Sequence, residues 1–591
     1  MKQFQIAYEN DESFRGELNE IERWRAANPS YATVFRIYSA GMDLERIKHV
    51  CDMLDAEMPD ALYLGCTSNG SILEGALAEP EIILSCTVFE YETTRAKLLQ
   101  FPFTEENAKD VVRELKAYCD ANPWVSAVEM HATVLGMSVQ ELCSEMSTLR
   151  SDIQVFGGGA CNSNENDMMT AVFSKESGIS MQGIVFLLLG GEDFHIYSTQ
   201  IAGWTPLRRK FKATKAYRQI LFELDGEPAF NIYRRFLNID RNDKFVTNTL
   251  EFPLFVDYNG VDVLRCPILV NDDNSILLTA EVTQGSDVRL AYGDPELILN
   301  SILHDGQGIA DFQPEVIQTF SCAARRAFWG DQSISEETAL FNGVAPTSGF
   351  YTAGEFLRAD GIVRTFNITL VFAAMREGEP KASEAVRSFA AKLDNIESDR
   401  ITLIRRFVSF IDASTAEFED LNRKLAVTSI TDGLTGLYNR AEIERRMRSA
   451  VDKCAQGEGS GDLSIIMLDI DNFKRINDVY GHREGDHVII AVADVLRRVL
   501  DAAHTSYLGR WGGEEFMVLL PGCDIGEATA LAERIREEFA TVSYETADRQ
   551  TVSIGVIQAK DDEDADACYN RVDNAMYKAK EKGKNRVVKL D

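Results

Sequence analysis

Hydrophobic residues in the first ~380 positions alternate between short continuous runs and stretches with a helical period. The continuous runs predict buried strands, and the periodic stretches predict amphipathic helices. Predicted strands occupy residues 61–65, 82–89, 183–190, 276–283 and 365–373, and predicted helices occupy residues 43–54 and 105–121. This alternation is typical of α/β or α+β folds, here arranged as two packed units.

A different pattern follows Pro380. Apolar residues recur there in steps of mostly three and four, at Val386, Phe389, Leu393, Ile396, Leu403, Phe407, Phe410 or Ile411, Phe418, Leu421 and Leu425. The spacing is typical of a coiled-coil seam, which Arg400 interrupts. It favours a parallel two-helix connector over residues 381–428. The alternative is a single amphipathic helix that packs on one neighbouring domain.

Beyond residue 430, polar motifs gather at the ends of predicted strands. Asp469 ends one apolar run, and Glu514 and Glu515 follow the Gly512–Gly513 pair that leads into another. Carboxylates that converge from adjacent strands suit Mg²⁺, which prefers oxygen ligands and phosphate groups. Glycine also lets the backbone approach a phosphate closely, because it has no Cβ. These residues predict a site for a metal and a polyphosphate.

The overall charge limits the classes of partner. Lys and Arg number 61 against 93 Asp and Glu, a formal net charge of −32, so duplex nucleic acid and anionic membranes are not expected partners. An anionic substrate therefore requires a local basic pocket, which Lys474, Lys580 and Lys584 can supply. Asn477 and Asp486 are plausible readers of guanine, because a carboxylate accepts hydrogen bonds from its N1–H and amino groups.

The cysteines and the apolar runs indicate the compartment. The 11 cysteines are scattered singly, without a zinc-type pair or cluster, which predicts reduced thiols. The first residues lack the apolar region of a signal peptide. The longest apolar run, residues 184–189, is far shorter than the ~20 residues of a membrane span. We therefore expect a cytoplasmic protein.

The C-terminal motifs resemble a known family when they are taken in order. DGLTGLYNR, DIDNFKRIND, YGHREGD, RWGGEEF and AKEKGKNR are similar to the successive signatures of GGDEF diguanylate cyclases, over residues 429–591. The resemblance implies a ferredoxin-like α/β palm, like that of nucleotidyl cyclases and polymerases. It also implies Mg²⁺- or Mn²⁺-dependent condensation of two GTP molecules into cyclic di-GMP and pyrophosphate. A homodimer that forms through the helical linker would bring the two GTP molecules together.

The same resemblance implies roles for individual residues, carried over by matching motif. The implied catalytic residues are Glu514, Lys474 and Glu515; the implied metal ligands are Asp469, the Ile470 carbonyl, Glu514 and Glu515; and the implied substrate contacts are Asn477, His482, Asp486, Gly512, Gly513, Arg510, Lys580 and Lys584. Many members carry an R-x-x-D product site upstream of the signature. Ala503 and Ser506 replace its arginine and aspartate here, which predicts weak or absent feedback inhibition by that route.

Shorter glycine-rich motifs in the first two-thirds resemble FIST sensory domains. They are LGCTSNG (64–70), VFGGGA (155–160), LDGEPA (224–229), FSCAARR (320–326) and GFYTAGEF (349–356). The resemblance implies a FIST N-like domain over residues 1–215 and a FIST C-like domain over residues 216–378, which sense amino acids or similar small metabolites. The candidate ligand contacts are Cys66, Thr67, Ser68, Arg325 and Glu355. Alternatively, these glycines only form tight turns, and the region is a scaffold or dimer platform.

Two other functions compete with a ligand-controlled cyclase. One is a non-catalytic GTP-binding or interaction module, which is expected to lose a metal carboxylate or the lysine. Asp469, Lys474, Glu514 and Glu515 are all present, which favours the enzyme. The other is a cyclase that makes a mononucleotide product, which the full GGEEF signature disfavours.

Overall fold

The computed structural model describes residues 1–164, 168–258, 261–381, 403–455, 462–500, 506–544, 546–560 and 563–590. These residues form two compact units, Met1–Asp412 and Ala413–Asp591. Part of the predicted connector (residues 382–402) and most of the predicted R-x-x-D position (residues 501–505) lie outside the described residues. Within the described part of the chain, no helix is long and apolar enough to cross a membrane.

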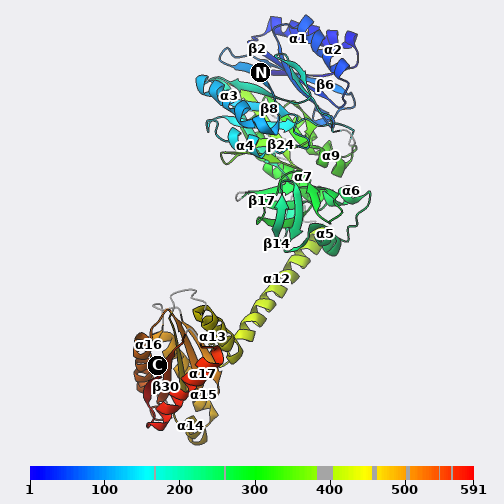
Figure 1. The fold of residues 1–591 in the computed structure, drawn as a ribbon. Coiled ribbons are helices and arrows are strands. Elements are labelled where there is room, and N and C mark those ends of the chain that lie inside the picture. Colours follow the sequence, from blue (N-terminus) through cyan, green and yellow to red (C-terminus); the bar gives the residue numbers. More distant parts are fainter. Residues whose placement is uncertain are drawn as a thin grey trace. The chain divides into compact units, whose positions relative to one another are not determined.

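Three six-stranded sheets form most of the first unit (Figure 1). The first has the order β1(Lys2–Ala7), β6(Ile82–Phe89), β2(Ala32–Ser39), β3(Leu62–Thr67), β10(Val172–Ser174) and β11(Gly178–Ser180). The second has the order β25(Ile362–Phe366), β24(Glu355–Ala359), β9(Gln154–Gly159), β8(Val125–Ala132), β12(Gly183–Gly190) and β7(Arg95–Pro102). The third has the order β13(Phe194–Ile201), β26(Leu370–Glu377), β22(Val316–Cys322), β23(Thr347–Thr352), β4(Ser71–Leu73) and β5(Ala76–Leu77).

Helices bury the apolar faces of these sheets. α1(Asp11–Ala27) and α2(Leu44–Glu57) pack on the first sheet, and α3(Ala108–Ala121), preceded by the 3₁₀ turn Glu105–Asn107, packs with α4(Gln140–Met146) on the second. Four helices share a hydrophobic core with the third sheet: α7(Pro295–Asp305), α8(Gln307–Phe312), α9(Ala323–Trp329) and α10(Glu336–Asn342). The helices follow the expected sequence signals. α1, for example, begins at an asparagine cap whose side chain accepts from the Ser13 amide, and it buries Phe14, Leu18 and Ile21.

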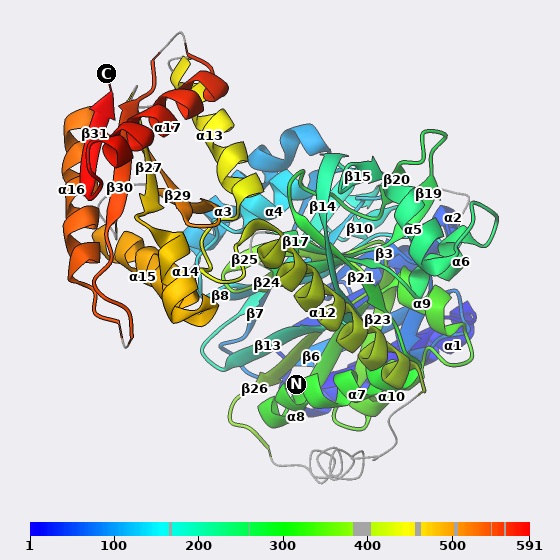
Figure 2. The same cartoon turned by 90° about the horizontal axis from the view of Figure 1, so that it is seen from below.

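An eight-stranded sheet completes the unit (Figure 2). Its order is β18(Val261–Arg265), β17(Leu254–Tyr258), β21(Asp287–Tyr292), β14(Thr205–Tyr217), β15(Ile220–Leu224), β20(Ile276–Leu278) and β19(Pro267–Val270), with β16(Glu227–Pro228) paired to β15. α5(Ala229–Leu237) and α6(Phe245–Leu250) pack beside it. The mixed α/β architecture expected for this region is confirmed.

The N-terminal and C-terminal parts of this unit are interleaved. β24 and β25 complete a sheet whose other strands precede residue 191, while β4 and β5 extend a sheet built from later strands. The predicted boundary at residues 215/216 falls within β14. The two halves therefore share sheets, whereas the pattern of hydrophobic residues had indicated two units packed against each other.

Two predicted strands are wrong in part. The run 276–283 forms a strand only as far as Leu278. The run 365–373 is divided between β25 and β26, because Ile368 between them takes the left-handed conformation, with φ +58°. Continuous apolar character alone does not reveal such an interruption.

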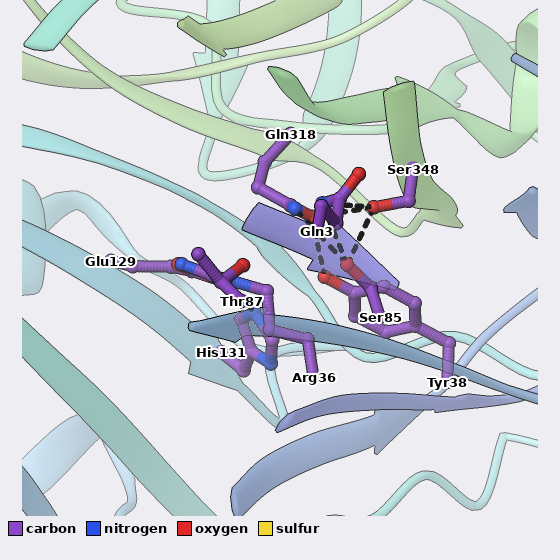
Figure 3. A network of polar contacts seen from close by, with 9 residues as sticks. All are labelled: Gln3, Arg36, Tyr38, Ser85, Thr87, Glu129, His131, Gln318 and Ser348. Atoms are coloured by element: carbon purple, nitrogen blue, oxygen red, sulfur yellow. Dashed lines mark hydrogen bonds and ion pairs between the residues drawn. The ribbon is translucent and has the colours of Figure 1, made fainter. Parts of the chain in front are cut away.

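A buried polar network links the three six-stranded sheets (Figure 3). Arg36 of β2 donates through Nε to both carboxylate oxygens of Glu129 on β8, at 3.1 and 2.9 Å. His131, also on β8, lies 3.1 Å from Glu129 Oε1. On the third sheet, the Ser348 hydroxyl donates to Ser85 at 2.8 Å, which joins β23 to β6. All of these side chains are fully buried.

The second unit contains one five-stranded sheet with helices on both faces (Figure 2). The strand order is β28(Tyr507–Gly512), β29(Glu515–Pro521), β27(Leu463–Ile470), β30(Val552–Gln558) and β31(Arg586–Leu590). α14(Phe473–Tyr480), α15(His482–Val499) and α16(Ile525–Thr541) border one core, and α13(Arg440–Ala455) and α17(Ala565–Glu581) cover the other face. α12(Leu403–Ile430) is the helix that leads into this unit.

Candidate active site

The two central strands of the C-terminal sheet place two carboxylates side by side. Successive side chains of β27 alternate between the two cores, so Ile466 and Leu468 face α15 and α16, while Ile465 and Met467 face α13 and α17. Asp469 belongs to the second set, and its register partner on antiparallel β29 is Glu515. Directly opposed residues project from the same face of a sheet. The sequence pattern therefore brings these two predicted site residues together.

Burial and mutual repulsion govern the charge of this pair. Desolvation raises the pKa of Asp469, which is only 6% exposed, and the nearby Lys580 opposes that rise. Desolvation also raises the pKa of Glu515, and the charge of Asp469 adds to the effect. Lys580 Nζ lies 2.8 Å from Asp469 Oδ2. One ammonium group thus lies near two carboxylates, so the ionised groups carry an excess of negative charge that a cation would offset.

The donors suit a divalent cation whose coordination a substrate completes. Among the residues that the structure describes, no group of three or more His, Cys, Asp or Glu side chains is gathered to hold a metal ion by itself. Mg²⁺ commonly takes only one or two protein carboxylates together with waters and substrate phosphates. The opposed Asp469 and Glu515, with the half-buried Glu514 on the adjoining turn, fit that requirement. Ile470 lies at the same strand end, where its amide donates to the Glu514 carbonyl at 3.4 Å.

The turn between β28 and β29 leaves open space beside these carboxylates. A Cβ on Gly512 or Gly513 would meet no atom within 4 Å, and Gly513 has φ +45°. Arg510 fixes this turn, because its Nε and Nη2 donate to the Gly513 carbonyl at 2.9 and 2.7 Å. Its Nη1 donates to Asp432 at 3.2 Å. Arg510, for which the resemblance implied a substrate contact, therefore positions the glycine turn. Its partner Asp432 is a residue that the sequence motifs did not indicate.

Asp471, the second aspartate of the DIDNFKRIND motif, has a different environment from Asp469. Asp471 accepts hydrogen bonds from the hydroxyls of Thr551 and Ser553, each at 2.6 Å, and from the Asn585 amide at 3.0 Å. It is 3% exposed, and these bonds join β30 to the turn before β31. Lys584, in that same turn, donates to the Asn472 side chain, which places it beside the start of α14. Asp471 thus orders the edge of the site.

The predicted guanine-reading residues lie where α14 meets α15. Gly481, with φ +85°, joins the two helices. A Cβ on Gly485 would lie 2.0 Å from Asn477 Oδ1, so the glycine permits the close approach of the two helices. His482 and Asp486 are exposed on the first turns of α15, and Lys474 is exposed near the start of α14. All four predicted residues therefore lie on one helical corner.

The candidate ligand contacts of the first unit are used within the protein. Cys66, Thr67 and Ser68 are fully buried at the end of β3, where Thr67 Oγ1 accepts from the Ala171 amide at 3.0 Å and Ser68 donates to the Ser39 carbonyl at 3.2 Å. Arg325 forms a buried ion pair with Glu337. They are not among the residues that line the two hollows beside α4. Gly65 lies within β3, and the glycines at 157–159 lie within β9, so these glycines do not mark turns, and ligand binding by the candidate residues stays a prediction.

Glu355 is fully buried and accepts hydrogen bonds from the hydroxyls of Thr352 and Thr369, at 2.8 and 2.7 Å. Burial raises its pKa to about 7, although these hydrogen bonds oppose the rise. An unfolded glutamate titrates near pH 4.3, so the folded state alone holds the proton between about pH 4.3 and 7. The resulting stability is fully present below about pH 4 and is lost as the pH rises through about 7.

We expect the free energy of unfolding of this unit to fall by up to about 3 kcal/mol between roughly pH 4.5 and 7.5 through this group alone. Glu355→Gln, which stays neutral, is expected to remove that part of the pH dependence and to stabilise the protein at neutral pH. Urea titrations of both proteins at several pH values measure the difference. Parallel pH profiles for the two proteins would contradict the prediction.

Comparison with known proteins identifies three domains in the chain. Residues 429–586 match the family model "Diguanylate cyclase, GGDEF domain", residues 33–227 match the FIST N domain, and residues 229–358 match the FIST C domain. The chain is 39% identical over 173 residues to diguanylate cyclase DgcM of Escherichia coli K12, and 34% identical over 223 residues to diguanylate cyclase VdcA of Vibrio cholerae. The alignments cover 29% and 33% of this chain, and 41% and 63% of those proteins.

Among solved structures, the coiled coil and GGDEF domain of DgcB from Caulobacter crescentus, in complex with c-di-GMP, is 32% identical. That similarity covers 31% of this chain and 98% of the solved DgcB chain, with a TM-score of 0.29. Of the two curated relatives, DgcM and VdcA, the chain spans less than two-thirds of the length. The family resemblances that the motifs indicated are confirmed: the chain carries a C-terminal GGDEF domain preceded by FIST N and FIST C domains.

Proposed function

We propose that this protein is a diguanylate cyclase that condenses two GTP molecules into cyclic di-GMP with release of two pyrophosphates. The observation that carries the proposal is the opposed pair Asp469 and Glu515 beside the open Gly512–Gly513 turn. This arrangement combines carboxylate oxygens with space for a polyphosphate, at the end of a GGDEF-type sheet. The non-catalytic alternative is less favoured, because the implied carboxylates and lysine are all present.

Each proposed role follows from the surroundings of the residue. Asp469, the Ile470 carbonyl, Glu514 and Glu515 would hold Mg²⁺ or Mn²⁺, which when bound would offset the charge of the phosphates. Asn477 and Asp486 would orient guanine on the corner of α14 and α15, with His482 beside them. Lys474 would place its ammonium group near the phosphates, since its side chain is exposed next to the site.

The reaction needs a base and a second nucleotide. The 3′-hydroxyl oxygen of one GTP forms a bond to the α-phosphorus of the other, the bond from that phosphorus to pyrophosphate breaks, and Glu514 takes the hydroxyl proton. The same step, repeated with the two nucleotides exchanged, closes the ring. One domain binds one GTP, so two domains must face each other, and their alignment is itself a source of rate enhancement.

Incubation of the purified chain with GTP and Mg²⁺, followed by mass spectrometry of the nucleotides, tests the proposal. The expected products are cyclic di-GMP and pyrophosphate. Unchanged GTP would support the non-catalytic GTP-binding or interaction module instead. A cyclic mononucleotide would support a cyclase that makes a mononucleotide product. A parallel reaction with ATP provides the control for guanine recognition.

We further propose that α12 pairs with α12 of a second copy. Phe407, Phe410, Ile411, Phe418 and Leu421 are more than half exposed on this helix. A row of exposed large apolar side chains on one helix is costly in water, and pairing with a second helix would bury it. This supports the coiled-coil reading of the sequence over packing against a neighbouring domain.

Phe410→Glu combined with Phe418→Glu is expected to convert the dimer to a monomer, because it places like charges in the apolar seam. Analytical ultracentrifugation measures the mass, and the cyclase rate per protein is expected to fall with it. Ser409→Glu, which adds a charge at an exposed position on the opposite side of the same helix, is the control and should leave the dimer intact. An unchanged mass for the double variant would refute pairing through α12.

A further inference from the structure

A cavity of about 390 Å³ lies in the first unit, away from the candidate residues Cys66, Thr67 and Ser68. Three parts of the chain form its wall. They are residues 134–147, which include α4; residues 362–367, which include β25; and Gln219, Arg265 and residues 279–281 from the region of the eight-stranded sheet. Small-molecule sites typically have volumes of roughly 300–1,000 Å³, so this cavity can accept a metabolite.

The lining combines an apolar surface with an excess of positive charge. Val134, Met137 and Ile362 contribute apolar side chains, while two arginines, Arg265 and Arg364, stand against one carboxylate, Glu281. Both arginines are almost fully buried, at 3% and 4% exposed. Burial of a charged group is costly, and Arg265 offsets part of that cost by donating to the Glu281 and Leu264 carbonyls at 3.1 and 2.9 Å. The charge excess favours an anionic guest.

Two hydrogen-bond donors of this lining have no partner among the described residues. Arg364 donates through Nη1 to the Ala359 carbonyl at 2.9 Å, but its Nε is buried without an acceptor. The Asn367 amide nitrogen is likewise buried without an acceptor. Glu281 differs, since it already accepts the Ser138 hydroxyl. An acceptor carried by a guest would satisfy these two donors.

A second hollow adjoins the cavity. A neighbouring hollow of about 670 Å³ shares Ser138, Gln140, Ser144 and Glu281 with it. Acidic side chains line this hollow, but Lys109 pairs with Glu141 at 2.7 Å, and Arg218 pairs with Glu105 at 2.5 Å. Four carboxylates, those of Glu105, Glu141, Glu145 and Glu281, stand against these two cations, so the excess of positive charge belongs to the cavity alone.

We propose that this cavity binds a small carboxylic acid with an apolar body, whose carboxylate accepts hydrogen bonds from Arg364 and Asn367. The apolar body would lie against Val134, Met137 and Ile362. Such a guest would contact α4, β25 and the region of the eight-stranded sheet at once, so its binding would stabilise their mutual packing. Control of GTP turnover by this guest rests on the proposed function, whereas the binding itself does not.

The probes are hexanoate, isovalerate and phenylacetate, each compared with its own primary amide. The amide keeps the shape and removes the charge, so it tests recognition by the guanidinium group. Thermal shift and isothermal titration calorimetry on the full chain, without nucleotide, measure binding. We expect at least one acid to raise the melting temperature and its amide to have a much smaller effect.

Three variants locate the site. Arg364→Gln is expected to weaken binding of that acid roughly ten-fold or more, because a charged hydrogen bond is lost. Ala280→Phe fills the cavity and should abolish binding. An unchanged circular dichroism spectrum would show that this variant is still folded. Arg241→Gln, at an exposed ion pair with Asp272, is the control and should bind normally.

The outcomes separate the two proposals. Equal effects of acids and amides, no effect of any acid, or normal binding by both Arg364→Gln and Ala280→Phe would overturn the carboxylate site. Rates of GTP turnover with and without the acid are measured separately. Binding that persists in a protein without cyclase activity would overturn the proposed function and leave the site intact.

Discussion

Glu515→Gln is expected to lower the rate of cyclic di-GMP formation by roughly a thousandfold or more, with the fold intact. The substitution keeps the shape of the side chain and removes one of the two opposed charges that would attract the metal and the phosphates. Burial and the charge of Asp469 raise the pKa of Glu515, so its ionised form is unfavourable in the folded protein. The variant should therefore melt at the same temperature as the native protein or higher.

Product formation from GTP and Mg²⁺, measured together with the melting curve, checks both parts of this prediction. Glu537→Gln, at an exposed position in the same domain, is the control and should change neither quantity. Asp469→Asn is expected to reproduce the loss of activity. A Glu515→Gln enzyme that keeps a substantial fraction of the native rate would overturn the assignment of the site.

Arg36→Met is expected to reduce the free energy of unfolding of the first unit by about 3–5 kcal/mol. The substitution removes the guanidinium group that donates to the Glu129 carboxylate and leaves that carboxylate buried. His131, at 3.1 Å, remains beside it. Arg36 lowers the pKa of Glu129 against the opposing effect of burial, so its removal exposes the full desolvation cost. The double substitution Arg36→Met with Glu129→Leu should recover a large part of the loss, because it removes both charges.

Urea unfolding of the three variants measures these free energies, and the double-mutant cycle isolates the coupling. Arg46→Met provides the control. Its ion pair with Glu81 spans 2.9 Å, but both side chains are about one-third exposed, so the expected loss is at most about 1 kcal/mol. Similar losses for Arg36→Met and Arg46→Met would show that the buried pair is not a central element of stability.

The pairing of Asp469 with Glu515 could be predicted from the sequence for a local reason. Strand alternation and the glycine turn are properties of neighbouring residues, and they place Asp469 beside Glu515 once the two strands pair. The roles of Arg510 and Asp471 depend on distant partners. Arg510 contacts Asp432, 78 positions away, and Asp471 contacts Asn585, 114 positions away. No periodicity in the chain indicates such contacts.

The FIST region was less predictable for the same reason. Some of its glycines lie inside strands, as in β9, where the motif had suggested a turn. The residues beside them are buried and bonded within the protein, as Thr67 and Arg325 show. The cavity is lined by parts of the chain as far apart as Val134 and Asn367. Asn367 lies in the run 365–373, which the hydrophobic pattern assigned to one continuous strand and which the structure breaks at Ile368. Arg364 lies just before that run, in β25.

The exchange of strands between the FIST N and FIST C regions has a consequence for synthesis on the ribosome. The sheet of β7, β8, β9 and β12 cannot gain β24 and β25 until residue 366 has left the exit tunnel, and β4 waits for β23 at residues 347–352. During that interval β4 and β9 present open backbone edges, which are prone to pair with other chains. The nascent FIST region therefore stays incomplete for about 200 residues of elongation, roughly 10–40 s at about 5–20 residues per second, and this is the period in which chaperones would protect it.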